Sequence, residues 1–190
     1  MRKITLDIET TNAAPGRIDP GTMNLALVAI HDSETDTYDS FLEEDLPRLW
    51  AILERADAII GYNSDHFDIP ILNRYYPGDL THIKSIDLLV DVRASLGRRI
   101  KLDAIAEATL GRKKTGSGLD AIEWWEQGDV ERVRAYCIED VKITKQIYDF
   151  ALENGFIKYS DFGKTQKVPI DTRAWEENDD KTSMTHTLPF

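Results

Sequence analysis

The sequence contains a single cysteine, Cys137, so no disulfide framework can form within the chain. It also lacks an uninterrupted apolar run of the roughly 18–20 residues that a membrane-spanning helix needs. The opening residues, MRKITLDIET, become acidic before any apolar stretch of signal-peptide length, and we therefore expect no secretory signal. The four histidines are scattered and lack the spacing of a zinc site (His31, His66, His82, His186). These absences favour a protein of the reducing cytoplasm.

Negative charge, by contrast, is abundant. The 190 residues include 34 Asp and Glu against 23 Lys and Arg, a formal net charge of −11 at pH 7. This balance argues against a general nucleic-acid coat protein, which is normally basic. The charge is nevertheless uneven, because residues 31–57 hold nine acids and two bases whereas residues 93–118 hold seven bases and two acids. An acidic chain with one basic segment can still contact a polyanion locally.

Hydrophobic periodicity predicts an α/β fold with a mixed central sheet flanked by helices. Three strands come first, in an antiparallel meander (KITLDIETT, NLALVAIHD, DTYDSFLEE), and DAIIGYN is a later buried strand. Helices are expected in LPRLWAILERA, FDIPILNRYYP, IDLLVDVRASLG, LDAIAEATLG, GLDAIEWWEQG and DVERVRAYCIEDVKITKQIYDFALENG. The predicted organisation is one domain over residues 1–163 and a polar tail over residues 164–190, either mobile or ordered by a partner.

Two carboxylates, Asp7 and Glu9, stand two residues apart in the first predicted strand. Residues i and i+2 of a strand project to the same face, so both carboxylates point the same way. Like charges side by side are unfavourable unless a cation lies between them, and a hard divalent cation with oxygen ligands is the natural partner. A solvated strand face is the alternative for this fragment alone.

A second motif, GYNSDHFD, follows the predicted buried strand and opens the next helix. Asp68 is a plausible N-cap of that helix, and a capping carboxylate can also bind a metal ion through its other oxygen. Asp65 lies in the same loop, and we expect it to face solvent.

A third motif places Tyr136 and Asp140 four residues apart, on one face of the last helix. Taken alone, this pair suits a packed tyrosine and a surface aspartate.

Taken in order, Asp-x-Glu, Asn-x-x-x-Phe-Asp and Tyr-x-x-x-Asp resemble the motifs of DEDDy 3′–5′ exonucleases of the RNase H-like superfamily. The resemblance covers about residues 1–160 and extends to the proofreading domain of family B DNA polymerases and to predicted bacterial and archaeal RNase H-like exonuclease domains. It implies an RNase H-like fold and phosphodiester hydrolysis at single-stranded 3′ ends, with DNA favoured over RNA, in DNA replication or repair. Two divalent cations, Mg²⁺ or Mn²⁺, are then implied at Asp7, Glu9, Asp68 and Asp140, with Tyr136 orienting the attacking water.

The predicted substrate contacts surround these motifs. They are Thr10, Asn63, Phe67, Arg98, Arg99, Lys101, Lys113 and Lys114, with Arg112 beside the last two. Asn63 is equally suited to brace its loop, Phe67 to the core, and the basic residues to a solvated surface. Trp124 and Trp125 are expected to pack rather than to stack on bases, and Cys137 to fill space in the core.

The final residues, THTLPF, loosely resemble the tips of bacterial single-strand-binding proteins and of sliding-clamp-binding peptides, which suggests such a replication partner. Two alternatives to an exonuclease remain open. One is a catalytically inactive module of the same fold that binds nucleic acid or serves as a scaffold. The other is an RNase H-like nuclease that cuts internally, for example in RNA–DNA hybrids.

Overall fold

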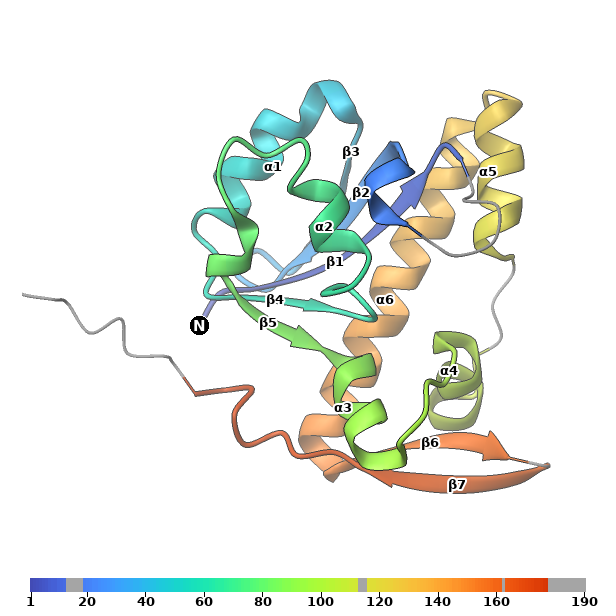
Figure 1. Ribbon diagram of the computed structural model, residues 1–190. Coiled ribbons are helices and arrows are strands. Elements are labelled where there is room, and N and C mark those ends of the chain that lie inside the picture. The colour runs from blue at the N-terminus through green and yellow to red at the C-terminus, as the bar shows by residue number, and fades with distance from the viewer. Residues whose placement is uncertain (13–18, 113–115, 162, 178–190) are drawn as a thin grey trace, which may run out of the picture.

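The computed structural model describes residues 1–12, 19–112, 116–161 and 163–177. At its centre lies a five-stranded sheet with the strand order β3-β2-β1-β4-β5 (Figure 1). The strands are β1 (Lys3–Thr10), β2 (Leu25–Asp32), β3 (Thr37–Phe41), β4 (Ala58–Gly61) and β5 (Lys84–Asp87). β2 pairs antiparallel with both β1 and β3, whereas β4 pairs parallel with both β1 and β5. This mixed sheet confirms the predicted fold class.

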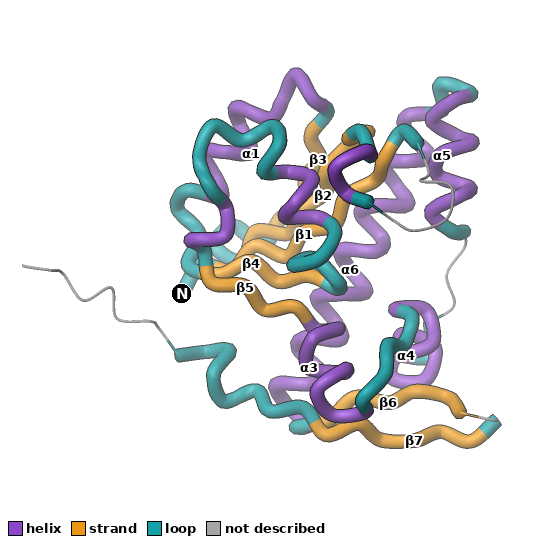
Figure 2. Tube along the Cα trace, in the orientation of Figure 1, coloured by secondary structure: helices purple, strands orange, loops and turns teal. Residues whose placement is uncertain are grey.

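Helices cover both faces of the sheet, as Figure 2 shows. They are α1 (Leu46–Leu53), α2 (Asp68–Leu72), α3 (Leu88–Leu96), α4 (Leu102–Leu110), α5 (Gly118–Glu126) and α6 (Val130–Asn154). Short 3-10 helices span Pro20–Thr22, Glu43–Asp45 and Leu80–His82. α1 and α2 pack on one face of the sheet, and α6 crosses β1 and β2 on the other. No helix in the described part of the chain is both long and apolar enough to span a membrane.

The alternation predicted for β1 determines where its acidic residues point. Ile4, Leu6 and Ile8 are buried in the cluster that contains the apolar side chains of α1 and α2. Because successive side chains of a strand point to opposite faces, the odd-numbered residues of β1 lie on the α6 side. Asp7 and Glu9 therefore project together toward α6, near the carboxyl end of β1.

The structure contains a strand that periodicity did not predict. Ile86 and Asp87 were expected to open a helix, but they form the end of β5, and α3 begins only at Leu88. Asp87 is the N-cap of α3, where its carboxylate accepts the Leu89 N–H. A four-residue strand that runs directly into a helix offers too few residues for a period to be recognised. β5 completes the parallel side of the sheet.

The structure also differs from the predicted tail. β6 (Phe156–Asp161) and β7 (Lys164–Pro169) form an antiparallel hairpin, so the expected boundary at residue 163 falls at its turn. After the hairpin, Trp175 is buried, stacks on Tyr148 with ring centroids 5.0 Å apart, and donates its indole N–H to Asp91 at 3.0 Å. Residues 164–177 are thus packed against the domain. The THTLPF segment lies outside the described residues.

Candidate active site

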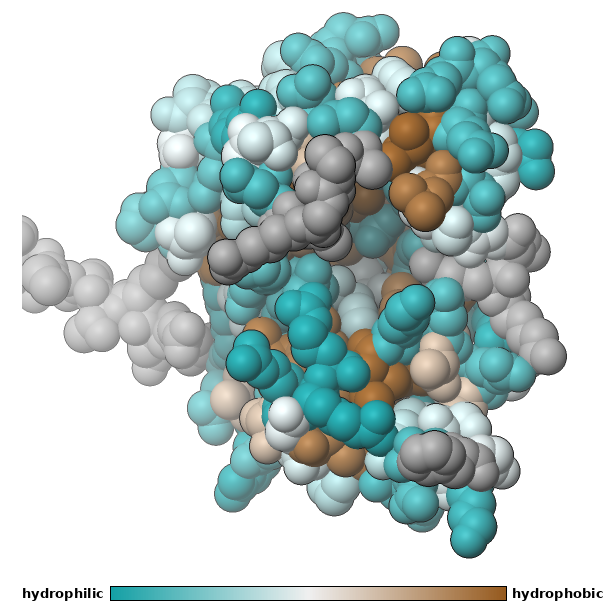
Figure 3. All heavy atoms as spheres, turned by 45° about the vertical axis from the view of Figure 1, so that its right-hand side comes forward, coloured by the Kyte–Doolittle hydropathy of each residue, from teal (hydrophilic) through white to brown (hydrophobic). Residues whose placement is uncertain are grey.

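A cleft of about 520 Å³ lies at the carboxyl ends of β1 and β4. All five residues that the sequence predicted as catalytic line it, namely Asp7, Glu9, Asp68, Tyr136 and Asp140. The predicted substrate contacts Thr10 and Phe67 line it as well. The N-terminus of α5 forms the opposite wall with Ser117, Gly118, Leu119 and Ile122. Figure 3 shows a hollow on this face with hydrophobic side chains gathered beside it.

Asp7 and Glu9 form the base of the site. Glu9 is buried and Asp7 is half-buried, and one ligand atom from each of them, together with the Cys137 sulfur, fits within a 4.8 Å spread. Two carboxylates held this close and partly out of water repel each other unless a cation screens them. The alternative of a solvated strand face is therefore not what the fold produces at this position.

Asp68 joins α2 to β1. It is the first residue of α2 rather than the predicted N-cap, a position that Phe67 occupies, and its Oδ1 accepts the Ile8 N–H at 3.1 Å. Burial raises the pKa of Asp68 to about 7, an effect that the nearby Asp87 charge reinforces and that hydrogen bonds from the Ile8 and Asp68 N–H groups oppose. The side chain thus carries a carboxylate whose charge is poorly compensated by the protein alone.

Tyr136 and Asp140 come from α6, which begins at the N-cap Asp129 and ends at Gly155 in a left-handed conformation. Both side chains are buried and reach the cleft from one face of the helix, as their i, i+4 spacing predicts. The Tyr136 ring packs edge-on against Trp124, with centroids 5.8 Å apart. Trp124 is thus a packing residue, as expected.

Cys137 is buried, as predicted, but it also contacts the site. Its thiol donates to the backbone oxygen of Asp7 at 3.3 Å and approaches Oδ2 of the same residue at 3.4 Å. Burial raises the pKa of Cys137, and so do the charges of Asp7, Glu9 and Asp140. The negative charges of carboxylates from two of the three motifs therefore raise the pKa of this one thiol. No local pattern in the sequence signals this contact, because the two residues lie 130 positions apart.

The loop between β4 and α2 forms the rim of the site. Asn63 adopts a left-handed backbone conformation with φ of 69°, and its side-chain oxygen accepts a hydrogen bond from Arg99 at 2.7 Å. The Tyr62 hydroxyl donates to the Ile100 carbonyl at 2.6 Å, which ties the same loop to the α3–α4 connection. These bonds agree with a bracing role for Asn63, while its contact with substrate stays a prediction. Phe67 packs partly on the core and also lines the cleft, so its contact with substrate likewise stays a prediction.

The basic residues that were predicted to contact substrate differ in their ion pairs and in their exposure. Arg98 pairs with Asp161 at 3.2 Å and Arg112 with Glu139 at 3.0 Å, so both have acidic partners within the chain. Lys101 is exposed at the N-cap position of α4. Lys113 and Lys114 lie outside the described residues. Substrate binding by this group is therefore still a prediction.

The mixed sheet, with an acidic cleft at the carboxyl ends of its parallel strands, has the architecture of an RNase H-like nuclease. A family model of the RNase_H superfamily matches residues 4–152, and the chain belongs to this superfamily. Among solved structures, the chain is similar to the family B DNA polymerase from the hyperthermophilic archaeon Pyrobaculum calidifontis, with a TM-score of 0.62 and 19% identity over 80% of this chain. It spans 24% of the polymerase chain, and this identity shows a shared fold alone. No curated protein matches the chain.

The comparisons confirm the RNase H-like fold that the motifs implied, and superfamily membership supports nuclease function. The donor set also fits the divalent metals of RNase H-like nucleases. Asp7, Glu9, Asp68 and Asp140 supply carboxylate oxygens to one cleft, and hard cations such as Mg²⁺ prefer oxygen ligands. The raised pKa of Asp68 shows that the protein by itself does not neutralise this charge. A cation in the cleft would do so.

Proposed function

We propose that the protein is a metal-dependent 3′–5′ exonuclease that hydrolyses phosphodiester bonds at single-stranded nucleic-acid ends, with DNA favoured over RNA. The observation that carries the proposal is the convergence of Asp7, Glu9, Asp68, Tyr136 and Asp140 on one cleft. These residues come from three segments far apart in the sequence. An inactive module of the same fold has no need to keep all five together.

Asp7, Glu9, Asp68 and Asp140 would hold two divalent cations, Mg²⁺ or Mn²⁺. When bound, such cations stabilise the negative charge that develops on the attacking and leaving oxygens during phosphodiester hydrolysis. Asp68 must lose its proton before it can serve as a ligand. Its pKa of about 7 makes cation binding at this residue compete with protons near neutral pH.

Tyr136 would position the attacking water through its hydroxyl group. A phenol with an ordinary pKa near ~10 is a weak base at neutral pH, so orientation is a better role for it than proton removal. The edge-on contact with Trp124 supports the ring that carries this hydroxyl. The Cys137 thiol helps to fix the neighbouring Asp7 carboxylate.

The cleft walls suit an unpaired nucleotide. Phe67 and Met23 on one side, and Leu119 and Ile122 on the other, present apolar surface that can receive a base. Leu119 is 66% exposed, so its apolar side chain is accessible to a ligand in the cleft. Arg99 and Lys101 lie on the connection that is tied to the rim of the site and would contact the phosphate backbone.

Digestion of 5′-labelled single strands tests the proposal. Single-stranded DNA and RNA of the same sequence are incubated with Mg²⁺, Mn²⁺ or EDTA. We expect a ladder that shortens from the 3′ end with either metal, no cleavage in EDTA, and faster loss of DNA. Asp140→Asn is the inactive control.

A circular single strand separates the alternatives, because it offers no end. Cleavage of the circle would establish internal cutting and refute the exonuclease. Binding of single strands without cleavage under any metal would instead favour the inactive module.

A further inference from the structure

Asp87, at the end of β5, holds the loop that leads to Asp68. Its carboxylate is buried and accepts three backbone N–H groups: Asn63 at 2.7 Å, Asp65 at 3.1 Å and Leu89 at 2.9 Å. Leu89 belongs to α3, whereas the other two residues belong to the β4–α2 loop. A single side chain thus fixes the backbone of that loop to the neighbouring parallel strand.

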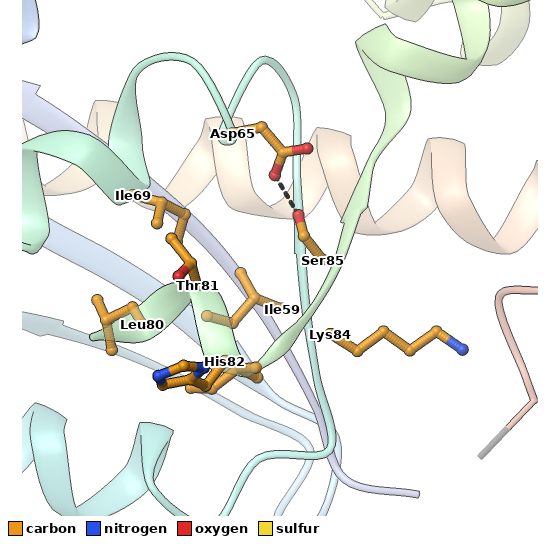
Figure 4. Close-up of a pocket in the computed structure, with 9 residues that line it drawn as sticks. Ile59, Asp65, Ile69, Leu80, Thr81, His82, Lys84 and Ser85 are labelled. Atoms are coloured by element: carbon orange, nitrogen blue, oxygen red, sulfur yellow. Dashed lines mark hydrogen bonds between the residues drawn. The ribbon is translucent and has the colours of Figure 1, made fainter. Parts of the chain in front are cut away.

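The loop needs this support because its conformation is unusual. Asn63 has a left-handed backbone, which an asparagine tolerates but does not favour. A Cβ atom at Gly61 would collide with the Ser64 side chain, so the turn after β4 is tight. Ser85 of β5 adds a second tie, since its hydroxyl donates to the exposed Asp65 carboxylate on the outer side of the loop, beside a separate pocket of about 500 Å³ (Figure 4).

The loop ends at Asp68, so its backbone determines where that carboxylate lies. Asp68 is held to β1 by the Ile8 N–H, and the charge of Asp87 acts on it as well. Asp87 itself does not line the cleft. Its oxygens are occupied by amide donors, Oδ1 by Asn63 and Leu89 and Oδ2 by Asp65. Asp87 is therefore not placed to bind a cation directly.

We infer that Asp87 is a positioning residue, which sets the Asn63–Asp68 loop through two backbone hydrogen bonds and thereby places the Asp68 carboxylate for a divalent cation. This inference rests on the proposed function of the cleft. Partners of this kind behind a metal ligand are worth about 10- to 100-fold in metal affinity or activity.

Asp87→Ser and Asp87→Asn test the inference. Serine still caps α3 but is too short to reach the loop, whereas asparagine keeps one acceptor oxygen and the size of the side chain. The matched control is Asp91→Asn, which changes a partly buried carboxylate on α3 that accepts a hydrogen bond from Trp175 and none from the loop amides that Asp87 holds.

Three measurements follow each variant: amide hydrogen exchange at Asn63 and Asp65 in metal-free protein, Mn²⁺ affinity by calorimetry, and turnover on a labelled single strand. For Asp87→Ser we expect faster exchange at both amides, Mn²⁺ affinity lower by about 10- to 100-fold, and turnover reduced to a similar extent. In all three measurements, Asp87→Asn should give values between those of Asp87→Ser and the wild type, and Asp91→Asn should give wild-type values. If Asp87→Ser does not fold, the same comparison is made with Asp87→Asn.

If the folded Asp87 variants exchange their Asn63 and Asp65 amide hydrogens at the wild-type rate and bind Mn²⁺ with wild-type affinity, the inference is wrong. The proposed exonuclease function would not be affected by that result. A wild-type protein that binds Mn²⁺ without degrading 3′ ends would refute the proposed function. Under that result, a loss of Mn²⁺ affinity and faster amide exchange in Asp87→Ser would still support the positioning role.

Discussion

Replacing Asp68 with asparagine should make the metal-free protein more stable at neutral and alkaline pH, although it removes a predicted metal ligand. Asparagine has nearly the same shape as aspartate, and its side-chain oxygen can still accept the Ile8 N–H that Asp68 accepts at 3.1 Å. What the substitution removes is the ability to ionise. The buried carboxylate is costly to ionise because little in the protein compensates its charge.

The magnitude follows from the two pKa values of Asp68, about 7 in the folded protein and 3.8 as its ordinary value. Between these values the folded state binds more protons than the unfolded state, so the free energy of unfolding falls as pH rises and levels off above pH 7. At about 1.4 kcal/mol for each pH unit, the total is about 4 kcal/mol. Asp68→Asn should therefore match the wild type near pH 4 and exceed it by up to about 4 kcal/mol at pH 8.

Urea unfolding in EDTA at several values between pH 4 and pH 8 measures this difference. Adding Mn²⁺ at 100 times its dissociation constant should then raise the wild-type free energy of unfolding by about 2.7 kcal/mol, with a smaller gain for the variant. A variant that is destabilised by the same amount at every pH would refute the reasoning, because it would show that the charge of Asp68 is compensated in the folded protein.

Other substitutions test the remaining parts of the site and fold. Tyr136→Phe should reduce turnover with little change in Mn²⁺ affinity, whereas Asp7→Ala should abolish both; equal loss of affinity in calorimetry would contradict these separate roles. Cys137→Ala removes the thiol donor from Asp7, so it should lower turnover and reduce the free energy of unfolding in urea by roughly 1 kcal/mol. Cys137→Ser should restore part of the turnover. Trp175→Ala should cost roughly 3–5 kcal/mol in urea unfolding, because it empties the buried position against Tyr148; a value near zero would mean that residues 164–177 are dispensable for the fold.

The sequence was most informative where geometry is local. A period of two residues placed Asp7 and Glu9 on one side of a strand, and a spacing of four placed Tyr136 and Asp140 on one side of a helix. The structure agrees on both points, since all four line the cleft. The fold class also followed from the order of the predicted strands and helices, and superfamily membership confirms it.

Local patterns were least informative for short segments. β5 has four residues, and the β6–β7 hairpin joins polar residues that alternate with few apolar ones. Both form because neighbouring strands supply their hydrogen-bond partners and the core receives their apolar side chains, such as Ile86 of β5 and Val168 of β7. A polar composition alone therefore suggested a tail where the chain is packed.

By itself, the sequence predicted which side chains would carry the chemistry and determined which of them share a face, because these properties depend on residue type and on spacing within one element. Tertiary structure alone decided that Cys137 contacts Asp7, 130 residues away, and that Asp87 holds the backbone of Asn63, 24 residues away. Such contacts arise when separate elements pack against one another, and no local period records them.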